Sequence, residues 1–191
     1  YLSQISITAA STNNNVVLGG ISGQMTGGKI ERCGILSGSI ACTKTLGSYR
    51  MTGGIVGDVH HNTNYILDCF NLAAMSGPNG GPGGIVGRAN AASSYIRNCY
   101  FAGSGSLGGN IYAQNVGTPT VQNCYYKAAS YTAPGASATN QQTGLTESQM
   151  KSGMLTGLLN SMDGVTGGET DSLRSDRVWY QDRAEPAFNS R

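Results

Sequence analysis

A two-part motif that recurs along the chain restricts the possible folds more than any other feature. Two glycines followed by apolar residues begin at Gly19, Gly53 and Gly83, and a weaker copy begins at Gly108. A cysteine follows the first glycine of each copy by 14 or 16 residues, at Cys33, Cys69, Cys99 and Cys124. Two linked elements that keep their phase four times indicate a repeat protein with about four degenerate, glycine-rich units.

Each unit predicts two short strands joined by turns that are rich in Gly, Asn and Ser. One unit cannot bury its apolar face alone, so neighbouring units are expected to stack. The sequence therefore predicts a mainly β fold, a right-handed parallel β-solenoid of about four to five coils with a C-terminal capping helix. Like residues are expected to form inward ladders: Ile21, Ile55, Ile85 and Ile111; Ile30, Ile66, Ile96 and Val121; and Cys33, Cys69, Cys99 and Cys124.

A bend is predicted within the second strand of each unit. The ladder residue and the cysteine are three positions apart, and in a flat strand they would face opposite sides. Asp68, Asn98 or Asn123 precedes the cysteine in the last three copies, and Asn and Asp tolerate the left-handed backbone that a corner requires. Arg32 holds this position in the first copy, so the corner is predicted for the other three only.

The pattern changes near residue 128. We expect repeats over 1–127, a linker over 128–144 and a helical cap over 145–191. Thr146 and Gln149 fit a capping box, and apolar residues at helical spacing follow. One helix is expected from about 147 to 161, ending at Asp163-Gly164 and covering the open end of the stack, where a bare strand edge invites aggregation. The residues expected to pack beside it are Val178, Trp179, Pro186, Ala187 and Phe188.

Charge and hydropathy argue against two classes of partner. The formal net charge is +2 without a basic run, so no nucleic acid partner is expected. No apolar stretch reaches the roughly 18 residues of a membrane span, and none is predicted in this chain. The chain starts in what already resembles a strand and shows no signal peptide, which suggests a processed form or a piece of a longer protein.

The candidates for catalysis are few, and no catalytic residue, metal site or cofactor is predicted. Between residues 19 and 127 the acids are Glu31, Asp58 and Asp68, whereas a solenoid enzyme that cleaves glycans needs clustered carboxylates. His60 and His61 are adjacent, and adjacent side chains of a strand point apart, so a solvated turn is favoured over a metal or acid–base role.

Two further sequence patterns bear on cofactors and on oxidation. Residues 23–30 match a phosphate-binding loop except at Ile30, where a Ser or Thr should hold magnesium, so nucleotide binding is not predicted. The ladder cysteines fit buried thiols that act as small apolar side chains, although disulfides stay open as an alternative.

The tyrosines offer the main candidates for binding. Tyr65 and Tyr95 precede ladder isoleucines, and Tyr126 lies after the last ladder cysteine. Stacked over successive coils, outward rings would form a flat surface suited to sugar rings. The aromatic residues directly after the cysteines are instead expected to be buried or half-buried, and these are Phe70, Tyr100 and Tyr125.

The repeat resembles a known family. Gly-Gly-Ile-Val-Gly with a downstream Asn-Cys-Tyr is similar to the GLUG repeat of bacterial surface proteins, which also occurs in non-catalytic regions of some immunoglobulin A1-cleaving metallopeptidases. The segment from Leu145 to Gly153, with Trp179, Asp182 and Pro186, resembles the one that often closes such arrays. The resemblance covers about residues 19–188. It departs at Ser22, Arg32 and Asn110, which puts the first and fourth copies in doubt.

The GLUG resemblance implies a secreted or surface-anchored protein with a β-helical body. It implies no ligand and no catalytic residue, and the peptidases' His-Glu-x-x-His zinc motif does not occur in this sequence.

Three functional hypotheses follow. A non-catalytic structural or adhesive module of a bacterial cell-surface or secreted protein is favoured. A carbohydrate-binding module with an aromatic face is the alternative, and a solenoid glycan-processing enzyme has the least support. The expected location is extracellular or at the cell surface. Expected partners are a host glycan or an extracellular protein, and further copies of the chain could add end to end as a fibre.

Overall fold

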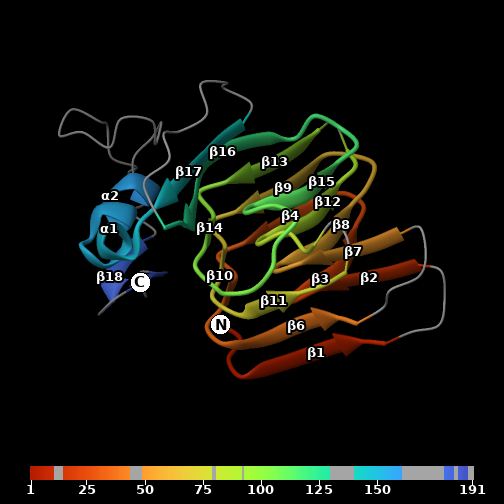
Figure 1. Ribbon diagram of the computed structural model, residues 1–191. Coiled ribbons are helices and arrows are strands. Elements are labelled where there is room, and N and C mark those ends of the chain that lie inside the picture. Colours follow the sequence, from red (N-terminus) through yellow and green to blue (C-terminus); the bar gives the residue numbers. More distant parts are fainter. Residues whose placement is uncertain are drawn as a thin grey trace.

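A computed structural model describes residues 1–10, 15–43, 49–78, 81–91, 93–129, 140–160, 179–182 and 185–188, and the chain is mainly β (Figure 1). Most strands belong to parallel sheets, and strands far apart in the sequence lie side by side. The mainly β, parallel character that the repeats predict is thereby confirmed. No helix among these residues is long and apolar enough to cross a membrane.

The largest sheet, here called the corner sheet, has two arms that share the long strand β16 (Thr120–Lys127). β17 (Asn140–Leu145) also pairs with β16. One arm contains β4 (Gly28–Glu31), β9 (Asn64–Leu67) and β13 (Ser94–Arg97). The other contains β14 (Tyr100–Phe101), β10 (Phe70–Asn71) and β5 (Gly34–Ile35).

The remaining parallel strands form smaller sheets. A four-stranded sheet has the order β15 (Tyr112–Asn115), β12 (Val86–Ala89), β8 (Val56–Val59) and β3 (Ser22–Met25). A three-stranded sheet has the order β1 (Ile5–Ala9), β6 (Gly38–Cys42) and β11 (Ala74–Ser76). A separate pair joins β2 (Asn15–Gly19) to β7 (Tyr49–Gly53).

The register of these sheets follows the sequence repeat. Ile66 pairs with Ile96, and Ile96 pairs with Val121. In the four-stranded sheet Val86 pairs with Val56 on one side and with Tyr112 on the other. Equivalent residues of successive repeats therefore lie beside one another, which places like side chains in columns.

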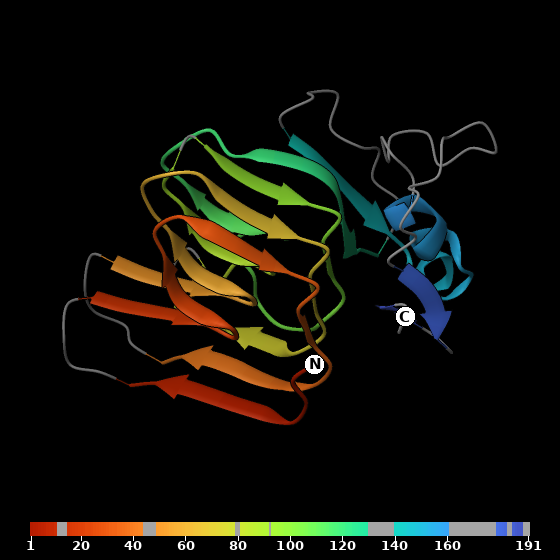
Figure 2. The same cartoon turned by 180° about the vertical axis from the view of Figure 1, so that it is seen from behind.

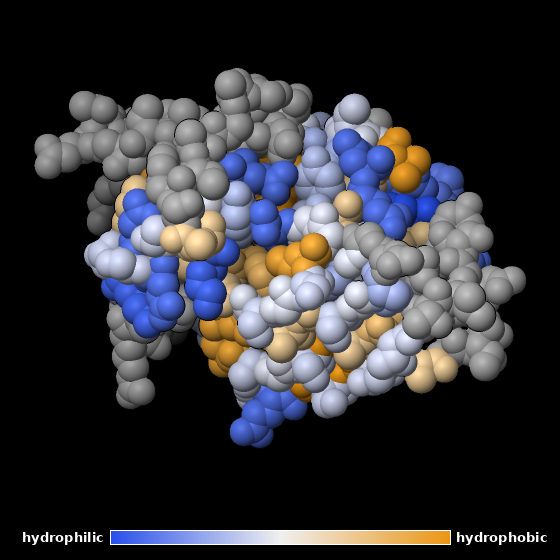
Figure 3. Space-filling view, in the orientation of Figure 1, coloured by the Kyte–Doolittle hydropathy of each residue, from blue (hydrophilic) through white to orange (hydrophobic). Residues whose placement is uncertain are grey.

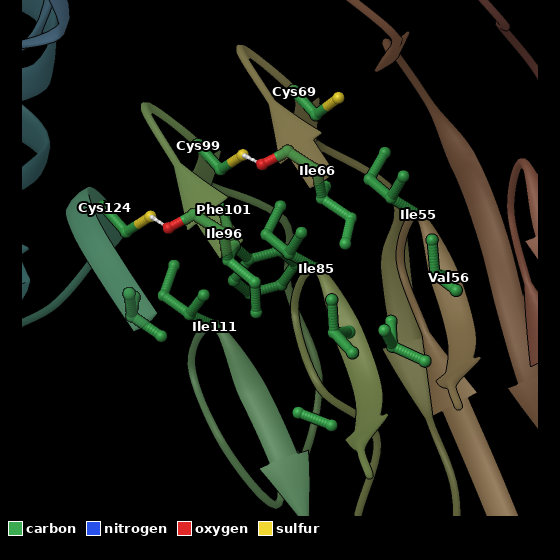
Figure 4. Close-up of a cluster of buried hydrophobic side chains, with 14 of the residues drawn as sticks. Ile55, Val56, Ile66, Cys69, Ile85, Ile96, Cys99, Phe101, Ile111 and Cys124 are labelled. Carbon is green, nitrogen blue, oxygen red and sulfur yellow. Dashed lines mark hydrogen bonds between the residues drawn. The ribbon is translucent and has the colours of Figure 1, made fainter. Parts of the chain in front are cut away.

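The interior columns form the main core. Ile55, Ile85 and Ile111 are fully buried, and so are Ile66, Ile96 and Val121 (Figure 4). Cys69, Cys99 and Cys124 are also buried and pack in the same cluster. Burying each aliphatic side chain of this kind contributes about 1.5–3 kcal/mol.

The first repeat departs from the expected ladders. Ile21 is 38% exposed although its N–H donates to the carbonyl of Ile55, so its predicted place in the core is wrong. Ile30 and Cys33 are only partly buried. The reason is positional, because β3 and β4 are end strands and no described strand pairs with their outer sides.

The corner is present in all four copies. Asp68, Asn98 and Asn123 have φ of 51°, 53° and 53°, which confirms the predicted left-handed bend. Arg32 adopts the same conformation, with φ of 54°, although its side chain gave no reason to expect it. Its N–H donates to the carbonyl of Leu67, so pairing with the next repeat holds Arg32 in a conformation that arginine seldom adopts alone.

The predicted single helix is two short helices, α1 (Glu147–Lys151) and α2 (Met154–Asn160). The capping box at Thr146 and Gln149 is confirmed. The break falls at Gly153, whose φ of +86° ends α1. The expected stop at 163–164 and Val178 lie outside the described residues, while β18 (Trp179–Asp182) pairs antiparallel with β19 (Glu185–Phe188).

The predicted linker over 128–144 is wrong at its C-terminal end. Residues 140–144 belong to β17, which pairs in parallel with β16 and buries Thr143 and Leu145. An added strand satisfies the backbone groups that the edge of β16 would otherwise expose. Residues 130–139 lie outside the described part of the chain.

The cap occupies a different place from the one expected. α1 and α2 lie beside the stack, next to β14 and β17, rather than over its last strand (Figures 1 and 2). Met150, Leu155 and Leu159 pack there in a second cluster, with Tyr100 and Tyr125 of the stack. The apolar side chains of the helices are thereby removed from water against Tyr100 and Tyr125.

Candidate functional site

Tyr65 and Tyr95 form an outward aromatic pair, here called the tyrosine pair. They lie on β9 and β13 in register, with ring centroids 5.1 Å apart and ring planes 11° from parallel. Their neighbours Ile66 and Ile96 are buried, so strand alternation turns the tyrosines outward. Tyr65 is 38% exposed and Tyr95 is half-buried.

Polar groups surround the tyrosine pair. The Arg97 guanidinium carbon lies 4.9 Å from the centre of the Tyr95 ring, within range of a cation–π contact. Lys29 on β4 is in register with Tyr65, and it forms an ion pair of 2.7 Å with Glu31. Aromatic rings can pack against a sugar ring, and the charged groups beside them can form hydrogen bonds with its hydroxyls.

Tyr126 does not join this pair. It lies in β16 past the corner, in register with Phe101, and it is half-buried. The structure thus brings together two of the three tyrosines proposed for binding, because the corner before Cys124 turns the chain away from the face that carries Tyr65 and Tyr95.

A second aromatic column follows the corner and is buried, as expected. Phe70 and Tyr100 stack with centroids 5.2 Å apart, and Tyr125 is in register with Tyr100. Trp179 contacts the Tyr100 ring edge-on at 5.6 Å. This column belongs to the cluster beneath the cap and offers no surface to a ligand.

The corner residues attach the cap to the stack. Trp179 Nε1 donates to Asp68 Oδ1 at 3.3 Å, and Asn123 Nδ2 donates to the carbonyl of Leu158 at 3.0 Å. Asn160 and the Trp179 backbone exchange two further hydrogen bonds, of 2.8 and 3.1 Å. The corner residues, which adopt the left-handed backbone, thus also provide hydrogen-bond partners for buried polar groups at this junction.

Cys69, Cys99 and Cys124 form a buried column whose side chains pack in the main core. All five cysteines are free thiols. The single S–H of Cys99 has the carbonyls of Arg97 and Ile66 as acceptors within reach, and that of Cys124 has those of Gln122 and Ile96. Figure 4 shows the contacts to Ile66 and Ile96. Burial raises the pKa of the Cys99 thiol well above its usual value. As a neutral, buried thiol, Cys99 is a poor nucleophile and a poor metal ligand.

An open groove separates β2 and β7 from the four-stranded sheet. Its volume is about 340 Å³. Asp58 lies at its floor with 1% exposure, and Arg88 binds that carboxylate through Nε and Nη2, both at 2.9 Å. Gln24 Nε2 donates to the same carboxylate at 3.1 Å. We call this site the polar groove, lined by Asn15, Val17, Gln24, Met51, Asp58, His60, Arg88 and Asn90.

The two histidines differ in position. Their rings stack at 3.7 Å, but His61 is exposed with φ of 51°, whereas His60 is half-buried and lines the polar groove. Asp68, the next acid along the chain, lies instead at the cap, where it accepts a hydrogen bond from Trp179. Within the described ranges, no three His, Cys, Asp or Glu side chains gather in a way that could hold a metal ion.

Sequence reasoning missed most of the polar groove, although a signal was present. Gln24, Asp58 and Arg88 each directly follow the glycine motif in successive repeats, and the register pairs them across β3, β8 and β12. Opposite charges at one repeat position predict contact once stacking is assumed. Asn15 and Asn90 carried no such signal. Among the described residues that line the groove Asp58 is the one acid, whereas glycoside hydrolysis generally uses two.

Comparison with known protein families, with curated proteins and with solved structures finds no match for this chain. The resemblance to the GLUG repeat therefore stays a prediction from the motif itself.

Proposed function

We propose that the chain is a right-handed parallel β-solenoid that acts as a non-catalytic structural or adhesive module of a bacterial cell-surface or secreted protein. The observation that carries this proposal is the in-register stacking of the repeats, in which Ile66, Ile96 and Val121 continue one buried column. A stack of this kind is a stiff body whose length grows with the number of repeats.

The use of the polar side chains supports a structural role. The corner residues Asp68 and Asn123 are bonded to the cap, and the ladder thiols donate to backbone carbonyls. The motif's resemblance to the GLUG repeat supports a location at the cell surface or outside the cell. The surface in Figure 3 has small apolar areas separated by polar residues, which suits a protein that meets water on this face.

A second candidate function is carbohydrate binding at the tyrosine pair. The observation that favours it is the near-parallel stack of Tyr65 and Tyr95, with Tyr65 open to solvent. The exposed Tyr65 ring offers apolar surface to the C–H face of a sugar ring, while the Arg97 guanidinium lies over the Tyr95 ring.

Binding of the purified chain to an array of glycans and host-matrix proteins tests both candidates. The Tyr65→Ala/Tyr95→Ala double variant is compared with Val116→Ala, which removes an exposed apolar side chain elsewhere. Saturable glycan binding that only the double variant loses would establish carbohydrate recognition at the tyrosine pair. Binding to a matrix protein that survives in both variants supports adhesion through another surface, and release of cleaved glycan products would overturn the non-catalytic assignment.

Self-association is a testable part of the same proposal. The N-terminal end of the stack carries Ile21 with an exposed side chain, beside β3, whose outer edge pairs with no described strand. Unpaired edges of this kind favour the addition of further strands. Sedimentation over a concentration series should show growth that Ile21→Thr reduces, and a strict monomer at every concentration would exclude end-to-end assembly.

A further inference from the structure

The floor of the polar groove carries one negative and one positive side chain, and their charges cancel. The Asp58 carboxylate receives two hydrogen bonds from Arg88 and one from Gln24, so its charge is matched within the groove. The other polar lining residues are Asn15, His60 and Asn90. Hydrogen-bond donors and acceptors thus lie side by side without a net field that would select an anion or a cation.

Stability alone does not explain this ion pair. A buried carboxylate and guanidinium lose hydration that their attraction roughly offsets, and apolar replacements are often as stable. Elsewhere the columns of the stack are mostly apolar, as at Ile55 and Ile85. The bidentate geometry does fix the planes of Asp58 and Arg88, and fixed polar groups bind a ligand with less loss of entropy.

The walls of the polar groove define the class of ligand. Val17 on β2 is half-buried and gives one apolar wall, and Met51, its partner in register on β7, also lines the groove but is only 3% exposed. His60 is the residue directly after β8, and Asn90 is the residue directly after β12, so both extend the polar floor past the ends of these strands. A cavity of about 340 Å³ is near the lower limit of ligand pockets, roughly 300–1,000 Å³, so the ligand is small.

We propose that the polar groove binds one neutral hexose unit. Its hydroxyls would exchange hydrogen bonds with Asn90, His60 and Arg88, which Asp58 holds in place, while its C–H face would lie on Val17. This site is separate from the tyrosine pair, which belongs to the corner sheet, and the inference does not depend on the proposed function.

Methionine-methyl NMR tests the proposal on the whole chain. The probes are the methyl glycosides of glucose, galactose, mannose and N-acetylglucosamine, with glucuronate as a charged comparison. At least one neutral glycoside should shift the Met51 methyl signal in a saturable way, assigned with Met51→Leu. Met154 lies on α2, away from the groove, and its exposed methyl group serves as the internal reference that stays unchanged.

Substitutions locate the binding site. His60→Ala and Asn90→Ala should each weaken binding by about threefold to tenfold, the usual loss for one hydrogen bond. Tyr65→Ala/Tyr95→Ala should leave the affinity unchanged, and thermal unfolding confirms that each variant is folded. The proposal fails if no neutral glycoside shifts Met51, if glucuronate binds more tightly than all of them, or if only the tyrosine variant loses binding.

Discussion

Two aromatic columns lie on either side of the same corner, and they differ in what covers them. Tyr65 and Tyr95 precede the corner and stack at 5.1 Å, while Phe70 and Tyr100 follow it and stack at 5.2 Å. Tyr65 is 38% exposed, whereas Tyr100 is fully buried. The two columns share one repeat spacing and almost the same ring geometry.

The comparison separates two causes of structure. In-register stacking sets the distance between rings in both columns, because equivalent residues sit on neighbouring strands. Burial is set by the C-terminal cap, which covers only the column that follows the corner. A column without a cap stays partly exposed to solvent, and a column with one becomes core.

The largest effect is expected at the buried column. Tyr100→Ala should lower the free energy of unfolding by about 3–5 kcal/mol, as large-to-small changes of buried aromatic residues do. Tyr100→Phe keeps the ring and should retain most of the stability. Urea unfolding followed by circular dichroism gives both values, and a loss under about 1 kcal/mol for the alanine variant would show that the cap does not bury this ring.

A smaller effect is expected where the cap meets the corner. Trp179→Phe removes the hydrogen bond from Nε1 to Asp68 Oδ1, and should cost about 1–2 kcal/mol in the free energy of unfolding. Asp68→Asn retains an oxygen that can accept this bond and should cost less. Thermal unfolding measures both variants, and equal stability of Trp179→Phe and the wild type would argue against this attachment.

The corner between the columns can be tested by its backbone. Asn98 has φ of 53°, a conformation that alanine disfavours and glycine accepts. Both Asn98→Ala and Asn98→Gly remove the oxygen that accepts from Asn123 Nδ2 at 2.7 Å. Their difference in unfolding free energy therefore isolates backbone strain, and we expect alanine to be lower by about 1 kcal/mol. Equal values would mean that the corner relaxes without cost.

The sequence predicts the repeated interior well because its signals are local and recur. The glycine motif and the cysteine keep phase, and the residue before the cysteine reports the corner through Asn98 and Asn123. The prediction for Ile21 fails because burial depends on which strand lies beyond it. No described strand pairs with the outer side of β3, and the motif carries no information about that neighbour.

The non-repeated parts are harder to predict for a related reason. Gly153 breaks the expected helix through one backbone angle, although the apolar spacing on both sides is helical. The polar groove depends on Asn15 and Met51, which come from strands whose position across the four-stranded sheet no repeat signal encodes. Only the contacts among Gln24, Asp58 and Arg88 follow from the register, because the three residues hold one repeat position.

The smallest effect is expected at the exposed column, and it sharpens the contrast with Tyr100. Tyr65→Ala and Tyr95→Ala should each change the free energy of unfolding by at most about 1 kcal/mol, because little surface is lost from the core. A double-mutant cycle should give a coupling of about 0.5 kcal/mol for the stacked rings, near the low end for aromatic pairs. A coupling as large as the loss at Tyr100 would mean that the exposed rings act as core, which would remove the main physical reason to regard them as a surface kept for a partner.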